Sequence, residues 1–170
     1  MDDLTNAAQP EPPIPPTTPP ATPSPYQGVG GWLLLLCIVL TIISPLVTLV
    51  SLVSGYNASS QYFHQFPGLV TLNIVDIILS VSLMAFSVYA GVGLWTLRPG
   101  AVAMAKRYLW FFLGYHVIVM FLPFMAGLPA AANNVMLAEV AKDMLRGFVY
   151  FVVWYAYLNK SERVKATYPA

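Results

Sequence analysis

The feature that most limits how this chain can fold is a long interval without charge, because no acidic or basic residue occurs between Glu11 and Asp76. Of the 170 residues, 58% are hydrophobic and only 9% are charged, whereas typical soluble domains are about 25% charged. A soluble core of this size cannot bury so much apolar surface, but a lipid bilayer solvates it. The sequence therefore predicts an all-α, polytopic membrane protein whose main partner is the lipid bilayer.

Four apolar segments are candidates for membrane-spanning helices. The first, 31–53, is uncharged over 23 residues, which gives about 34 Å of helix for a hydrocarbon core of about 30 Å. The second and third are 69–97 and 108–128. The fourth, 137–158, carries charges in its first turns and is expected to begin as an amphipathic helix at the interface. These segments predict a transmembrane four-helix bundle over 28–159; three spans plus a surface helix is the alternative.

The segments that flank this bundle are polar. Residues 1–27 contain nine prolines between Pro10 and Pro25 and no Lys or Arg, which predicts a disordered tail of polyproline type. Docking of its PxxP spacings to a partner domain is a weaker alternative. Residues 160–170 are expected to form a short basic tail.

The distribution of Lys and Arg predicts the orientation of the spans. Three basic residues follow the second span and three follow the fourth, whereas the other side has only Lys142 and Arg146. By the positive-inside rule both termini lie in the cytoplasm. The tryptophans agree with this topology, since all four fall near span ends on that side: Trp32, Trp95, Trp110 and Trp154.

Two features predict how the spans pack. Pro45 lies inside the first span, where its ring removes one backbone hydrogen bond, so the helix should kink and a neighbouring helix should shelter the freed carbonyl. In the second span Ser87, Ala90 and Gly91 provide small side chains, which permit close approach of helices and support either bundle packing or a homodimer.

Asp76 is the residue whose place in a membrane costs most, because a buried carboxylate there needs a partner, a proton or water. The sequence puts Asp76 at a depth similar to that of Arg146, so the two are expected to be able to meet. As a functional group Asp76 would be a coupling carboxylate in a transporter. The structural alternative is an ion pair, or hydrogen bonds to Asn73, Ser80 or tyrosine hydroxyls.

The other polar residues give weaker signals. His116 in the third span is expected to donate a hydrogen bond between helices, with proton relay as the alternative. Cys37 is the single cysteine and should pack as a small apolar residue, and His64 should be a solvated loop residue. No metal site, cofactor site or catalytic constellation is predicted, and the net charge of +1 gives no footprint for nucleic acid.

Two stretches at opposite ends of the apolar region carry a family resemblance. GVGGWLLLLCIVLTIISPL and RGFVYFVVWYAYLNKSERVKATYP resemble the bacterial four-span membrane proteins grouped as domain of unknown function 2569. The matching positions are Gly30, Gly31, Trp32, Leu33, Pro45, Arg146, Trp154, Tyr155, Ser161, Arg163, Val164, Lys165 and Thr167. Tyr155-Ala156 stands where many members have a proline beside the tyrosine, and Tyr168 stands where a phenylalanine is usual. The resemblance implies a multi-pass protein of the bacterial inner membrane and implies no activity.

The sequence leaves three functional classes open. The first is a non-enzymatic structural or interaction protein, whose bundle packs with itself or with another membrane complex. The second is a small oligomeric transporter or permeation element that uses Asp76, and the third is an intramembrane enzyme. We expect the first.

Overall fold

The computed structural model describes residues 28–125 and 130–168, and in this part of the chain all regular structure is helical. α1 (Trp32–Ile38), the π-helical segment η1 (Val39–Ile43) and α2 (Ser44–Ser60) follow one another without a break. α3 (Gly68–Trp95), α4 (Ala101–Met125) and α5 (Ala130–Lys160) are the other long helices, and α6 (Glu162–Thr167) is short. The predicted all-α class is confirmed; the tail 1–27 lies outside the described residues.

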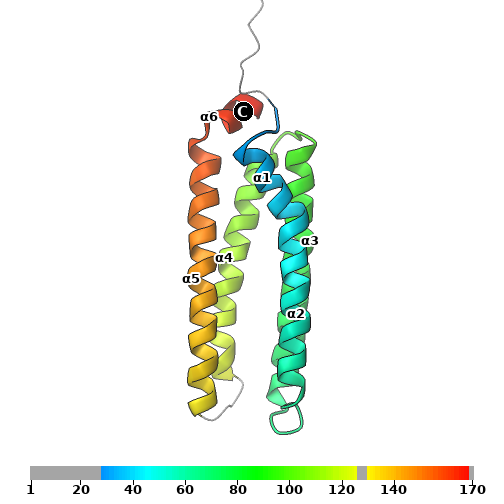
Figure 1. Ribbon diagram of the computed structural model, residues 1–170, viewed down its shortest axis with the longest axis vertical. Helices are drawn as coiled ribbons and strands as arrows, with labels where there is room; N and C mark the ends of the chain where they lie inside the picture. Colours follow the sequence, from blue (N-terminus) through cyan, green and yellow to red (C-terminus); the bar gives the residue numbers. More distant parts are fainter. Residues whose placement is uncertain (1–27, 126–129, 169–170) are drawn as a thin grey trace, which may run out of the picture.

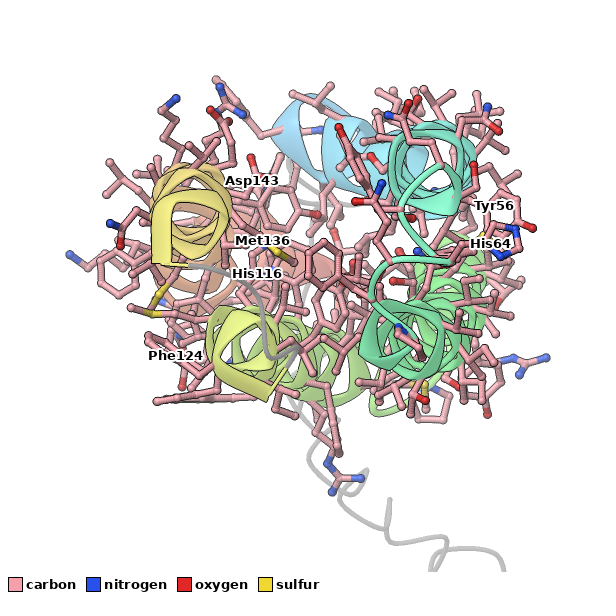
Figure 2. All side chains as sticks on the ribbon, turned by 90° about the horizontal axis from the view of Figure 1, so that it is seen from below. Tyr56, His64, His116, Phe124, Met136 and Asp143 are labelled. Atoms are coloured by element: carbon pink, nitrogen blue, oxygen red, sulfur yellow. The ribbon has the colours of Figure 1, made fainter. Side chains whose placement is uncertain are left out.

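The long helices stand side by side, with α6 lying across one end, which we call the α6 end (Figure 1). α2 packs on α3, α3 on α4 and α4 on α5. α1 and η1 also pack on α3. Seen along the bundle, α2 and α5 face each other across an interior space that α3 and α4 close from the other side (Figure 2).

Two segments are long and apolar enough to cross a membrane. By length and composition these are Trp32–Ser60 and Gly68–Trp95 within the described residues, and they correspond to the first two predicted spans. α4 and α5 cover the third and fourth predicted spans. That they also cross the bilayer remains a prediction, and residues 126–128 of the third span lie outside the described part.

α2, α4 and α5 extend beyond the predicted spans, so the segments between spans are shorter than the predicted bounds imply, and the segment after the last span is partly helical. α2 continues to Ser60, because Ser59 and Ser60 hydroxyls bond to carbonyls one turn back and allow small polar residues to stay helical. α4 begins at Ala101, directly after the Pro99-Gly100 turn. The expectation of a basic C-terminal tail at 160–170 is incomplete, since Glu162–Thr167 folds into α6 with Ser161 as its N-cap.

The close helix approach predicted for α3 is present. A Cβ built on Gly91 would lie 2.5 Å from Thr41 Cγ2 and 3.3 Å from the Thr41 backbone nitrogen. Only a glycine permits the backbones of α3 and η1 to meet at this distance.

The buried residues collect toward the α6 end of the bundle. The core consists of residues from α1, η1, the C-terminal half of α3, the N-terminal part of α4, the C-terminal part of α5 and α6. Its largest members are Leu33, Leu36, Leu40, Leu94, Tyr108, Leu109, Phe151 and Trp154. Cys37 is buried among them, as predicted. In contrast, α2 contributes no buried residue. The bundle is therefore tightly packed at the α6 end and loosely packed at the other.

Candidate functional site

A cavity of about 590 Å³ occupies the loosely packed interior between the helices. Its lining includes polar side chains from every long helix: Ser44, Thr48 and Ser51 of α2; Asp76, Ser80 and Ser87 of α3; Tyr108, Tyr115 and His116 of α4; and Asp143, Arg146 and Tyr150 of α5. Figure 2 looks into this space from the end opposite α6 and shows His116 and Asp143 beside it. Most of the lining surface is apolar, and the polar side chains that converge on it from every long helix mark the cavity as the candidate site.

Asp76 is held in the cavity wall by a tyrosine of the next helix. Tyr115 Oη donates a hydrogen bond to Asp76 Oδ1 at 2.8 Å, and the same hydroxyl lies 3.0 Å from Ser80 Oγ. The expected alternative of a tyrosine hydroxyl as partner is therefore what the structure shows. Asn73 takes another role, because its amide donates to Ser59 Oγ at 2.9 Å and ties the start of α3 to the end of α2.

The expected pair of Asp76 and Arg146 does not form. Both residues line the cavity, but Arg146 Nη1 lies 2.8 Å from Asp143 Oδ1 on its own helix. A second pair of the same spacing joins Lys142 and Glu139 at 2.7 Å. Residues three positions apart on a helix are adjacent on its surface, so Arg146 finds a carboxylate without crossing the cavity. The two pairs therefore neutralise the charges of these turns within α5.

His116 does not bridge two helices by a hydrogen bond. Its Nδ1 donates to the Phe112 carbonyl of the same helix at 2.9 Å, because a carbonyl can only accept. The imidazole packs instead on α5, where a Cβ built on Gly147 would lie 2.7 Å from His116 Cδ2. Gly147 is thus the residue that makes room for the ring between α4 and α5.

Sequence reasoning missed the tyrosines of the cavity. Tyr108 and Tyr115 lie seven residues apart and so on one face of α4, a signal that could have identified them. Tyr150 faces them from α5, and its hydroxyl oxygen is buried without a hydrogen-bond partner among the described residues. No pattern around Tyr150 indicated this.

A second structured region lies at the α6 end, where the two ends of the described chain meet; we call it the terminal clasp (Gly28–Leu33 with Ser161–Tyr168). The Gly28 N–H donates to Thr167 Oγ1 at 3.2 Å, and Tyr168 Oη donates to the Leu94 carbonyl at 2.5 Å. The Arg163 guanidinium covers Gly30, whose built Cβ would lie 2.5 Å from Nη1. Val164 is buried against the core.

Comparison with protein families matches residues 26–169 to Protein of unknown function (DUF2569). The chain belongs to the DUF2569 family. Comparisons with curated proteins and with solved structures find no match. In this DUF2569 protein most of the positions that carry the sequence resemblance, although more than a hundred residues apart, assemble into the terminal clasp. Trp32 of the clasp contacts a further resemblance position, Trp154 of α5, with ring centroids 6.4 Å apart in an edge-to-face arrangement.

Other resemblance positions of this DUF2569 protein lie away from the clasp. Tyr155 stacks on Phe151 with ring centroids 5.2 Å apart, on the α5 surface that faces Trp110 of α4. Lys165 belongs to the clasp, but its side chain pairs with Glu162 at 2.9 Å on the exposed side of α6. Pro45 is the second residue of α2, just after η1, and Arg146 lines the cavity. The resemblance positions therefore occur in both structured regions, but most belong to the clasp.

Proposed function

We propose that this chain is an integral protein of the bacterial inner membrane that spans the bilayer four times, with both termini in the cytoplasm. α4 and α5 have 25 and 31 residues, lengths that exceed the roughly 20 residues a span needs. Basic residues support the orientation, because six of the eight lie at or near the α6 end: Arg98, Lys106, Arg107, Lys160, Arg163 and Lys165. The contact of 2.8 Å between Lys106 Nζ and Asn159 Oδ1 joins the two groups.

Cysteine labelling tests this topology. In a Cys37→Ser background, Lys165→Cys at α6 and His64→Cys in the exposed loop between α2 and α3 place single thiols at opposite ends. We expect a membrane-impermeant maleimide to reach only the residue-64 thiol in intact cells, and both thiols after lysis. Labelling of residue 165 in intact cells would show that the orientation is opposite to the one proposed.

We propose further that the protein is a non-enzymatic interaction protein that assembles through the charged face of α5 (Glu139, Lys142, Asp143 and Arg146). The observation that carries this proposal is the exposure of the four side chains, which are between 60% and 77% accessible; Asp143 and Arg146 lie where this face meets the cavity. Arg146 lies 14 residues before the end of α5, about 21 Å along the helix. If the α6 end lies at the membrane surface, this distance places Arg146 inside the bilayer, where a charge facing lipid is costly. A polar surface of a second copy or of another membrane protein should therefore cover this face.

The oligomeric state in native lipid tests the assembly. Wild-type protein extracted with its lipid in polymer particles should show, by native mass spectrometry, a mass above the 18.6 kDa of one chain. Replacing Lys142 and Arg146 together with Glu makes the face wholly acidic and should release the single chain. Lys165→Glu is the matched control, because Lys165 forms an equivalent exposed pair with Glu162 on α6. A wild-type protein that is found only as one chain without a partner contradicts the proposal.

A small transporter or permeation element is the second candidate, favoured by the position of Asp76 in the cavity wall. Proton flux into liposomes tests it, with Asp76→Asn against the control Glu162→Gln. Flux through wild type no greater than through empty vesicles eliminates this candidate.

A further inference from the structure

Asp76 has most of its hydrogen-bonding capacity unused. A carboxylate offers about four acceptor sites, and Tyr115 Oη occupies one of them. No cationic side chain lies within 4.0 Å of Asp76 in the parts of the chain that the structure describes. The cavity therefore contains a carboxylate that is fixed in place by Tyr115 and still able to accept from a donor.

The charge of the cavity wall is negative. Asp76 and Asp143 contribute −2 and Arg146 contributes +1, which leaves −1 when His116 is counted as neutral. Because Arg146 already pairs with Asp143, the uncompensated charge is that of Asp76. Charge complementarity thus requires a cation beside Asp76 and disfavours an anion.

Aromatic rings of α4 and α5 line the same cavity as this carboxylate, and the hydroxyl of one of them, Tyr115, contacts it. Tyr115 and His116 have ring centroids 5.4 Å apart, and Phe112 connects them to α5, at 4.4 Å from His116 and 5.1 Å from Tyr150. Tyr150 lines the same cavity, and its buried hydroxyl oxygen has no hydrogen-bond partner within the described part of the chain. A carboxylate that shares a cavity with several aromatic rings supplies the groups by which proteins recognise ammonium ions, through charge and cation–π attraction. The volume of about 590 Å³ lies within the range of small-molecule sites and exceeds what a bare ion occupies.

We propose that this cavity binds an organic ammonium group, with Asp76 as its counter-ion and the aromatic wall of α4 and α5 against its carbon atoms. The ammonium belongs either to a free small amine or to the headgroup of an aminophospholipid. This inference does not depend on assembly through α5, since every group it uses lies within one chain.

The first experiment measures thermal stabilisation of the protein by choline in lipid nanodiscs that contain phosphatidylglycerol and no aminolipid. We expect saturable stabilisation by choline, and none by its uncharged carbon isostere dimethylbutanol or by an equal concentration of sodium chloride. Asp76→Asn should weaken choline binding about tenfold or more, and Tyr150→Phe should weaken it less. Glu162→Gln on α6 is the control carboxylate and should bind as wild type does.

The second arm identifies the source of the ammonium group. Native mass spectrometry of protein from nanodiscs with mixed phosphatidylethanolamine and phosphatidylglycerol should show retained phosphatidylethanolamine on wild type and loss of it in Asp76→Asn, if a lipid headgroup is the ligand. Choline binding without lipid retention assigns a free amine. Equal effects of choline, its isostere and sodium on the wild type, together with no retained lipid, overturn the proposal, whatever the folding of the variants. The same spectra report the oligomeric state, so failure of this site and failure of assembly are separate results.

Discussion

The Ser87 hydroxyl of α3 donates a hydrogen bond to the Leu40 backbone carbonyl of η1 at 2.8 Å. In a π-helical turn each carbonyl accepts from the N–H five residues on, as the Val39 carbonyl does from Ser44. For Leu40 that residue is Pro45, which has no N–H. Ser87 therefore supplies the donor that the proline lacks, and the shelter expected for the freed carbonyl comes from α3.

Ser87→Ala should lower the free energy of unfolding by about 1–3 kcal/mol, because it leaves a buried carbonyl without a donor. Ser82→Ala is the control on the same helix, since Ser82 is exposed and bonds to the Ile78 carbonyl of its own helix; its effect should stay within about 0.5 kcal/mol. Thermal unfolding in detergent measures both. Equal effects of the two variants would show that the bond to Leu40 contributes nothing.

Gly91→Ala should destabilise the bundle by about 1–3 kcal/mol, because the new methyl group overlaps Thr41 and forces α3 and η1 apart. Gly114→Ala in α4 is the matched control: a Cβ there meets nothing within 4 Å, and alanine is the better helix former by up to about 1 kcal/mol. The unfolding temperature should fall for Gly91→Ala and should stay the same or rise for Gly114→Ala. A Gly91→Ala protein as stable as wild type would contradict the packing described for α3 and η1.

Thr167→Val should loosen the terminal clasp, because it removes the hydroxyl that contacts both the N–H and the carbonyl of Gly28. The free energy that holds α6 against the N-terminal end should fall by about 0.5–1.5 kcal/mol. Faster tryptic cleavage after Arg163 and Lys165 in the folded protein reports the release of α6. Unchanged cleavage would mean that the burial of Val164 and the Tyr168 bond hold α6 without Thr167.

The clasp should also depend on alkaline pH. Burial raises the pKa of the Tyr168 hydroxyl above its ordinary value, so the folded protein keeps this proton while the unfolded chain loses it from about pH 10 upward. The contribution of Tyr168 to stability is therefore complete below about pH 10 and falls as the pH rises further. The difference in free energy of unfolding between wild type and Tyr168→Phe should shrink between about pH 9 and pH 11. A constant difference would place the hydroxyl in water.

Much of the helical architecture could be predicted, because long apolar runs and turn signals act locally. The Pro99-Gly100 turn separates α3 from α4, and the i, i+3 charges on α5 pair as their spacing requires. The ends of helices were less predictable. Ser59 and Ser60 lie beyond the predicted first span 31–53, yet their hydroxyls bond back to the helix and α2 continues to Ser60.

The candidate site was predicted only in part. Asp76 was identified by its cost in a membrane, but its partner was not, since Tyr115 is 39 positions away and nothing in its neighbourhood distinguishes it from other tyrosines. Arg146 pairs with Asp143 on its own helix instead of with Asp76. Side chains on one helix can be compared by spacing, but the choice among partners on different helices depends on the rotation of each helix about its axis.

The sequence by itself determined that this chain is helical, that its first two long segments can span a membrane, and that its basic residues gather toward one end. These properties follow from composition and from the spacing of apolar residues, both of which are local along the chain. The tertiary structure decided that α3 closes on η1 through Gly91 and Ser87 while α2 and α5 stand apart. That arrangement opens a polar cavity and brings the two ends of the described chain together. Both results depend on contacts between residues far apart in sequence, whose geometry is fixed only when the helices pack.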